Sequence, residues 1–211
     1  MELLKEFLIE ELHIEDTQVF EKFELYNNLI LEWNEKINLI SRKLDSVEST
    51  ILNSIFFLKK YDISKCKDIL DLGTGGGIPG IPLAILFPNI EFILLDSIKK
   101  KMLAVEDIIT KLKLSNVRII TGRAEEISRE KKYNHKFDIV IAKSVSTLKN
   151  LFDWGKGFLY KNGKIVCIKG GDVQKELDEL GKSKNIEVIN FNFGAKYQIE
   201  DKKIVIIRKL I

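Results

Sequence analysis

Apolar residues recur at helical spacing through the first sixty residues of the chain. Ile30, Trp33 and Ile37, for example, are separated by three and four positions, which places them on one face of an amphipathic helix. Asp16, just ahead of this pattern, offers a side-chain oxygen that can cap the start of a helix. A second candidate helix covers residues 46–60. The N-terminal region is therefore predicted to be helical.

From residue 66 onward, short continuous apolar runs alternate with longer helical stretches. Strands that are apolar at every position are buried on both faces, which predicts a parallel sheet with helices on each side. The last two strands have no helix between them and must pair antiparallel. The predicted strands are residues 69–70, 92–95, 117–120, 137–141, 164–168, 186–193 and 203–208, and the predicted helices are residues 81–87, 98–113, 123–131, 147–160 and 172–184.

This succession of elements is the one found in class I S-adenosylmethionine-dependent methyltransferases. We therefore expect an α/β, Rossmann-like fold with a mostly parallel seven-stranded sheet and an antiparallel C-terminal strand. Residues 1–60 are expected to form a helical extension packed on the core, and residues 61–211 the methyltransferase domain. A chain of 211 residues can bury about 70% of its unfolded surface, so it needs no disulfide or metal to fold.

Composition and charge narrow the class of protein. Hydrophobic residues make up 45% of the chain and charged residues 31%, as in ordinary soluble globular proteins. No apolar run approaches the roughly 18 residues of a membrane span, and the charged N-terminus lacks the features of a signal peptide. We therefore expect a cytoplasmic monomer without membrane contact. The formal net charge of +3 permits an RNA partner without requiring one.

The two cysteines, Cys66 and Cys167, are far apart in the sequence, and neither His13 nor His135 is near them. A zinc site needs clustered ligands. We therefore expect no metal site, and we interpret the cysteines as reduced structural thiols.

A glycine-rich segment, residues 73–80, directly follows a predicted strand. Glycine permits positive φ angles and lets a ligand approach the backbone closely. Gly75, Gly77 and Gly80 match the G-x-G-x-x-G spacing of dinucleotide sites, which place a pyrophosphate at a helix N-terminus. Asp71, at the strand end, would repel a pyrophosphate but attract the cationic sulfonium and amino groups of S-adenosylmethionine. The predicted contacts with this cofactor are Asp71, Gly73, Gly75 and Gly77.

Acidic residues also follow the next two predicted strands. Asp96 can accept hydrogen bonds from both ribose hydroxyls of an adenosine, although it could instead cap the following helix. Ala124 and Glu125 follow the third strand, where the adenine lies in this architecture. Glu125 and Glu126 could instead complement a helix N-terminus. Asp96, Ala124 and Glu125 are therefore candidates for contacts with the adenosine.

Residues 70–85 read Leu-Asp-Leu-Gly-Thr-Gly-Gly-Gly-Ile-Pro-Gly-Ile-Pro-Leu-Ala-Ile. This run resembles the signature of the bacterial 16S ribosomal RNA guanine-N7 methyltransferases, also known as glucose-inhibited division protein B. Its Pro-Gly-Ile-Pro is much more specific than the glycines before it. The resemblance covers roughly residues 25–209. Its other elements are Trp33-Asn34 with Asn38-Leu39, Leu95-Asp96-Ser97 with Lys100-Lys101, residues 122–126, Phe137-Asp138 with Trp154, and residues 159–170.

The resemblance implies an enzyme that uses S-adenosylmethionine to methylate N7 of a guanine in the decoding-region loop of 16S ribosomal RNA. Its partner would be this RNA or the small ribosomal subunit. The resemblance also implies a helical N-terminal extension on a class I methyltransferase domain. By matching position, it places cofactor contacts at Gly73, Ile78, Ala124, Glu125 and Lys143.

Three short segments depart from the family's pattern. Ser49-Thr50 and then Asn53-Ser54 stand where the family usually has Arg-His before Asp-Ser, Ala142-Lys143-Ser144 stands for Ser-Arg-Ala, and Lys202-Lys203 stands for Arg-His. Lysine keeps a positive charge but lacks the planar fork of arginine. The departures lie where RNA or the target base would be handled, and they leave the cofactor loop unchanged.

Guanine N7 has a lone pair and no proton, so it can attack the methyl group of the cofactor without a general base. The enzyme would act by aligning the reactants, which can supply on the order of 7–11 kcal/mol. We interpret Lys143 as a group that orients the base or the cofactor, because a cation can contact the N7 edge of guanine. Lys202 and Lys203 are interpreted as contacts to the RNA backbone. All three could instead be solvated lysines.

Two other functions fit the sequence. A diverged methyltransferase could act on another RNA or on a small molecule, as the replaced arginine and histidine residues would allow. A non-catalytic RNA-binding relative could retain the cofactor fold without the reaction.

Overall fold

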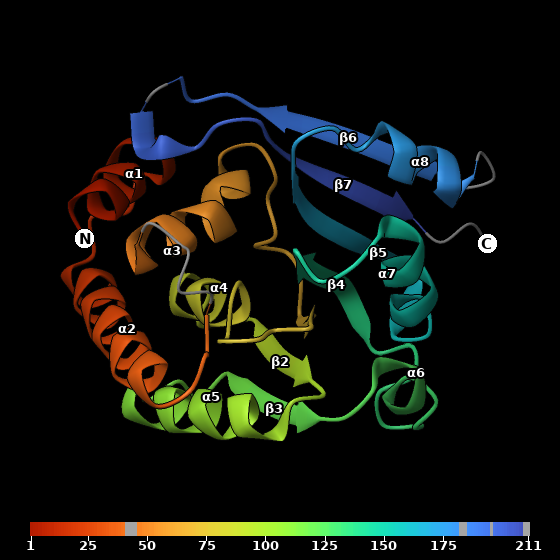
Figure 1. Cartoon of the computed structure of the whole chain (residues 1–211), viewed down its shortest axis with the longest axis horizontal. Coiled ribbons are helices and arrows are strands. Elements are labelled where there is room, and N and C mark those ends of the chain that lie inside the picture. Colours follow the sequence, from red (N-terminus) through yellow and green to blue (C-terminus); the bar gives the residue numbers. More distant parts are fainter. Residues whose placement is uncertain (41–45, 182–184, 195, 209–211) are drawn as a thin grey trace.

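The computed structural model describes residues 1–40, 46–181, 185–194 and 196–208. Within them, strands form one seven-stranded sheet in the order β3-β2-β1-β4-β5-β7-β6 (Figure 1). β1 to β5 run parallel, and β7 lies antiparallel between β5 and β6, so the predicted fold class is confirmed. The strands are β1 (Asp68–Leu72), β2 (Glu91–Asp96), β3 (Val117–Thr121), β4 (Phe137–Lys143), β5 (Leu159–Gly170), β6 (Asn185–Phe191) and β7 (Lys202–Arg208).

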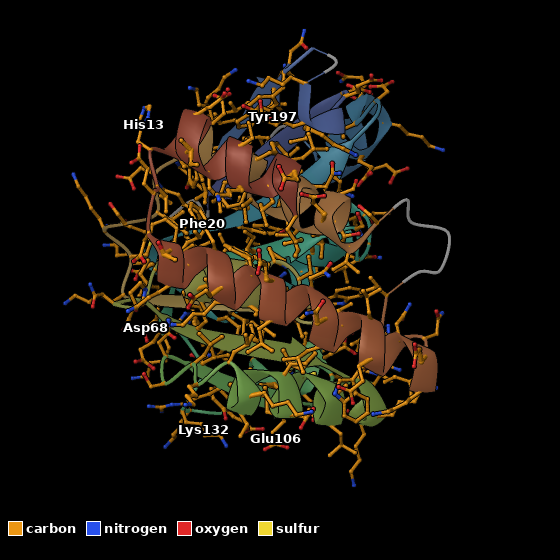
Figure 2. All side chains as sticks on the ribbon, turned by 90° about the vertical axis from the view of Figure 1, so that its left-hand side faces the viewer. His13, Phe20, Asp68, Glu106, Lys132 and Tyr197 are labelled. Carbon is orange, nitrogen blue, oxygen red and sulfur yellow. The ribbon has the colours of Figure 1, made fainter. Side chains whose placement is uncertain are left out.

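Helices cover both faces of the sheet. α1 to α5 lie on one face and α6 to α8 on the other (Figure 1), and Figure 2 shows α1 and α2 in front of the first face. No helix in the described ranges is long and apolar enough to cross a membrane. The helices are α1 (Glu2–Leu12), α2 (Thr17–Lys36), α3 (Val47–Ile55), α4 (Gly80–Leu86), α5 (Lys99–Lys111), α6 (Ala124–Ile127), α7 (Leu148–Gly155) and α8 (Gln174–Leu180), with the 3-10 helices η1 (Phe56–Lys59) and η2 (Lys196–Gln198).

The N-terminal helices begin where side chains cap them. Asp16 Oδ1 accepts a hydrogen bond from the N–H of Gln18 (2.8 Å), as the sequence predicts, and the Ser46 hydroxyl caps α3 in the same way (2.9 Å). The helix predicted for residues 46–60 is divided into α3 and η1, because the backbone at Ile55 leaves α-helical geometry.

One hydrophobic cluster joins the N-terminal helices to the first face of the sheet. Phe7 and Ile51 are fully buried in it together with Ile81 of α4 and Ile206 of β7. A second cluster fills the other face, under α7 and α8. Core packing thus crosses residue 60, and the predicted division into an extension and a domain stays a prediction.

Three predicted helices are too long. The helix predicted for residues 172–184 ends at Leu180, and residues 182–184 lie outside the described residues. The helix predicted for residues 123–131 is only Ala124–Ile127, and the one predicted for residues 147–160 ends at Gly155. Leu159 instead begins β5, where it pairs with the first residue of β4. The hydrophobic pattern alone does not distinguish an apolar residue at the end of a helix from one at the start of a strand. The pairing with β4 shows that Leu159 belongs to the strand.

The sheet creates a site because its strand order reverses beside β1. β1 pairs with β2 on one side and with β4 on the other, so the connections after β1 and β4 lead to helices on opposite faces. Ligands of open α/β sheets bind in the crevice that such a reversal leaves at the carboxyl ends of the strands.

Candidate functional site

The glycine-rich loop begins at the carboxyl end of β1 and turns over the end of β2. The N–H groups of Gly73 and Thr74 both donate to the carbonyl of Leu95, at 2.8 and 3.1 Å. Gly73 and Gly75 have φ angles of +74° and +57°, in the left-handed region that favours glycine. A Cβ atom on Gly75 would have no heavy atom within 4 Å. The loop therefore presents bare backbone to open space, where a ligand can approach it.

N-terminal residues hold this loop from behind. Tyr26 of α2 is fully buried and its hydroxyl donates to the carbonyl of Gly76 (3.1 Å). A Cβ atom on Gly76 would lie only 2.9 Å from the Ile40 side chain. The glycine loop is thus fixed by the N-terminal region as well as by the sheet.

Asp71 lies beneath the loop and is not among the residues that line the cavity, so its predicted contact with the cofactor stays a prediction. Its side chain is fully buried, and Oδ2 accepts hydrogen bonds from Thr74 Oγ1 (2.6 Å) and from the N–H of Gly80 (2.8 Å). Burial raises the pKa of the Asp71 carboxyl from 3.8 to about 7, although these two hydrogen bonds oppose the shift. Asp71 therefore joins the loop to the start of α4. Its other oxygen, Oδ1, has no hydrogen-bond partner among the described residues.

A cavity of about 490 Å³ opens beside the glycine loop. This volume is usual for a small-molecule site. Most of the predicted cofactor contacts line it: Gly73, Gly75, Ile78, Asp96, Ala124, Glu125 and Lys143. Gly77, like Asp71, is not among the lining residues, because it packs against Ile81 of α4.

Asp96 ends β2 and is compatible with both interpretations made from the sequence. Oδ1 accepts a hydrogen bond from the N–H of Ile98 (2.9 Å), ahead of α5. Oδ2 accepts one from the N–H of Gly75 (2.9 Å), which ties this carboxylate to the glycine loop. A carboxylate has about four lone-pair positions. The half-buried Asp96 therefore retains acceptor capacity toward the cavity that it lines.

The turn after β3 forms another wall of the cavity. The N–H of Gly122 donates to the carbonyl of Asp96 (3.0 Å), which fixes this turn beside β2. Ala124 is buried, Glu125 is exposed, and both line the cavity. Glu125 and Glu126 also lie in the first turn of α6, so a helix-terminal role for these acids remains compatible with the structure.

Lys143 is the last residue of β4, and its half-buried side chain lines the cavity. Within the described part of the chain, its ammonium group donates no hydrogen bond. Burial lowers the pKa of this ammonium; the carboxyl of Asp71 opposes the shift, and Lys202 adds to it. The cavity is therefore lined by a cationic donor that can still bind a ligand.

Lys203 is buried, and its predicted contact with RNA stays a prediction. It is 9% exposed, and its ammonium donates to the carbonyl of Gly171 and to Asp201 Oδ1 (3.1 Å). These bonds would have to break before the side chain could reach a phosphate. Lys202 is partly exposed and close enough to lower the pKa of Lys143, and its contact with RNA stays a prediction.

Sequence reasoning missed several residues that line the cavity. They include Ile40, Thr50, Lys101, Val145 and Trp154. Ile40 comes from the N-terminal region, and no local pattern shows which of its residues meet the glycine loop. Lys101 and Trp154 fall within the family resemblance and Thr50 within a segment that departs from it, and these were the available signals for them.

The lining residues fit S-adenosylmethionine. The bare backbone at Gly75 leaves room for close approach, the Asp96 carboxylate can accept hydroxyl groups, and the Lys143 ammonium can bind a carboxylate. The cofactor carries two ribose hydroxyls and a methionine carboxylate, which match these groups. In the described ranges, no group of three or more His, Cys, Asp or Glu residues could hold a metal ion.

Comparison with known proteins decides the family. The family model described as rRNA small subunit methyltransferase G (GidB) matches residues 19–205. The chain belongs to this family. The ribosomal RNA small subunit methyltransferase G of Chlorobium chlorochromatii is 35% identical over 189 residues, which cover 89% of this chain and 76% of the relative. That of Clostridium botulinum (strain Kyoto) is 36% identical over 193 residues, covering 88% and 80%. The protein is therefore an S-adenosylmethionine-dependent methyltransferase, as predicted.

Solved structures share its architecture. The O-methyltransferase from Bacillus cereus, determined in complex with SAH, matches with a TM-score of 0.60 at 16% identity and covers 98% of this chain and 97% of that one. The O-methyltransferase TomG from Streptomyces achromogenes matches with a TM-score of 0.60 at 14% identity, covering 97% and 95%. At such low identity, the likeness shows the fold alone.

Proposed function

We propose that this enzyme transfers the methyl group of S-adenosylmethionine to N7 of a guanine in the decoding-region loop of 16S ribosomal RNA. The relatives, described as ribosomal RNA small subunit methyltransferases, support an RNA acceptor. The N7 position is implied by the family resemblance, and one observation in the structure supports it, which is the set of titratable groups around the cavity.

Among the described residues that line the cavity, none is a histidine or a cysteine. Of the two acids there, Asp96 accepts two backbone hydrogen bonds and Glu125 is exposed. An acceptor that must lose a proton, such as an exocyclic amine, is best served by a base such as histidine, which the described lining of the cavity does not include. Guanine N7 needs none. The Lys143 ammonium can donate to the neighbouring O6 and leave the N7 lone pair free.

The chain's own residues would orient the reactants. We propose that the glycine backbone at Gly73 and Gly75, with Ile78, holds the cofactor, that Asp96 accepts its ribose hydroxyls, and that Ala124 and Glu125 lie beside its adenine. Asp71 and Gly77 would act indirectly, by shaping the loop. When bound, the cofactor supplies an electrophilic methyl group, and alignment of the guanine against it accounts for the rate enhancement.

The proposed function also bears on where the enzyme works and in which oligomeric state. We propose that it works in the cytoplasm, because ribosomal RNA is made and assembled there in bacteria. We further propose that it works as a monomer. Light scattering during size-exclusion chromatography would test the second point, and a dimeric mass would contradict it.

A different acceptor is the second candidate, and the N-terminal wall of the cavity favours it. Thr50 lines the cavity, is only 5% exposed, and carries no charge where the family usually has a basic residue. The Lys203 ammonium is also bound within the protein. An acceptor other than the decoding-region guanine would therefore be consistent with two of the three segments in which the chain departs from the family.

The deciding experiment is methyl transfer from labelled S-adenosylmethionine to undermethylated 16S RNA, free and within small subunits. Strand cleavage at N7-methylguanine then locates the modified base. Label at N7 of a single decoding-region guanine is the expected result. Label elsewhere in RNA, or none while the cofactor still binds, would contradict the proposed acceptor and favour the second candidate.

A further inference from the structure

The loop between β4 and α7, residues 144–147, forms part of the cavity wall next to the glycine loop. Ser144 and Val145 line the cavity, and Ser144 has a positive φ of 54°. The Val145 side chain lies directly against Gly73, because a Cβ atom there would be 2.7 Å from Val145 Cγ1. The position of this loop therefore sets the space available at Gly73, and it also fixes the adjoining Lys143.

Two charged residues outside the cavity bind the backbone of this loop. Lys169, near the end of β5, donates from its ammonium to the carbonyl of Ser146 (2.8 Å). The same ammonium contacts both carboxylate oxygens of Glu176 in α8, at 2.8 and 3.1 Å. Glu176 Oε2 in turn accepts a hydrogen bond from the N–H of Leu148, the first residue of α7 (2.8 Å). The pair thus holds the part of the loop that leads into α7.

The pair is shielded from solvent, which makes its bonds strong. The side chains of Lys169 and Glu176 are only 12% and 27% exposed. Hydrogen bonds between charged groups are shorter and stronger than neutral ones, and partial burial increases this difference. Other interactions also stabilise α7. Leu148 and Leu151 are fully buried, and the Thr147 hydroxyl caps the helix by accepting a hydrogen bond from the N–H of Asn150 (3.3 Å).

We propose that Lys169 and Glu176 are positioning residues for cofactor binding. Through Ser146 and Leu148 they hold Val145 against Gly73, and they keep the strand end that carries Lys143 in line with the glycine loop. Neither residue lines the cavity, so each acts through the loop. The inference rests on the cofactor part of the proposed function and is independent of the identity of the RNA acceptor.

Calorimetric titration with S-adenosylhomocysteine tests this proposal without measuring turnover. Lys169→Met should weaken binding at least tenfold. Lys169→Arg, which keeps the charge and the donors, should restore affinity to within about threefold of wild type. Glu176→Gln keeps an acceptor for the N–H of Leu148 and should give an intermediate loss. Lys59→Met is the control, because it breaks an ion pair of equal length, 2.8 Å to Glu11, between η1 and α1.

A double variant separates positioning from general destabilisation. If the pair acts through Val145, then Lys169→Met should have little further effect on affinity in a Val145→Ala background. Full additivity of the two losses, equal losses in Lys169→Met and Lys59→Met, or unchanged affinity in Lys169→Met would each overturn the proposal. Failure of the wild-type protein to bind would overturn the proposed function as well, so the two failures are distinguishable. Glu176→Gln and Lys169→Arg keep the test decisive if Lys169→Met does not fold.

Discussion

Replacing Asp71 by asparagine should remove a large part of the pH dependence of stability. The carboxyl is fully buried beneath the glycine loop, and its pKa is about 7 instead of the ordinary 3.8. The folded state therefore binds this proton more tightly than the unfolded state does. As the pH rises from about 4 to about 7, the unfolded chain ionises first, so the free energy of unfolding falls. Roughly three pKa units at 1.36 kcal/mol each correspond to about 4 kcal/mol.

Urea denaturation followed by circular dichroism, at pH values from 5 to 8, measures this change. At pH 5, the stabilisation that corresponds to about one of the three pKa units has already been lost. The difference in free energy of unfolding between wild type and Asp71→Asn should therefore change by roughly 3 kcal/mol between pH 5 and pH 8. Asp62→Asn is the control, because hydrogen bonds from Ser64 lower the pKa of that exposed carboxyl. The difference in stability between wild type and Asp62→Asn should therefore depend on pH only in more acidic solutions and stay constant from pH 5 to 8. A difference for Asp71→Asn that stays constant across this range would refute the raised pKa.

Three further changes probe the site. Gly73→Ala should weaken binding of S-adenosylhomocysteine at least tenfold in a calorimetric titration, because the new Cβ meets a side chain at 2.7 Å and φ is +74°. Gly171→Ala is the control for backbone strain, because Gly171 has a φ of +70° and open space around it. Equal losses of affinity in the two variants would contradict the placement of the cofactor. The rate of methyl transfer should fall as the pH rises through the lowered pKa of Lys143, because the ammonium then loses its proton. Lys143→Arg should abolish this fall, because arginine stays protonated. A fall that persists in Lys143→Arg would show that Lys143 takes no part in the mechanism. Tyr26→Phe leaves the carbonyl of Gly76 without its buried hydrogen-bond donor and should lower the free energy of unfolding, measured by urea denaturation, by about 1–3 kcal/mol. An unchanged midpoint of urea denaturation would contradict a stabilising role for this hydrogen bond.

The order of the elements could be predicted because it depends on local patterns. Strands apolar at every position predict a parallel sheet, and Gly73 and Gly75 stand where the backbone needs positive φ. Asp71 could not be placed in this way. Neighbouring residues of a strand point to opposite faces, but every residue from Ile69 to Leu72 is buried, so burial alone does not show the direction of the carboxylate. Only the approach of α4, through the N–H of Gly80, determines it.

The residues missed at the cavity depend on contacts between distant segments. Ile40 reaches the glycine loop because α2 crosses the first face of the sheet, where the Trp33 indole N–H also donates to Asp107 of α5 (2.8 Å). Lys203 is interpreted from the sequence as an RNA contact because Lys202-Lys203 stands where the family has Arg-His. It is buried because its strand, β7, is inserted between β5 and β6, and its ammonium satisfies the carbonyl of Gly171.

The hydrogen bond from Tyr26 to the carbonyl of Gly76 makes docking of α2 and occupation of the cavity linked equilibria. A ligand that requires the ordered loop favours the docked helix, and docking of the helix strengthens that ligand by the same factor. Cofactor should therefore protect the N-terminal helices from proteolysis, although no residue of α1 or α2 lines the cavity. Conversely, an acceptor that displaced α2 would weaken the binding of cofactor by the same linkage.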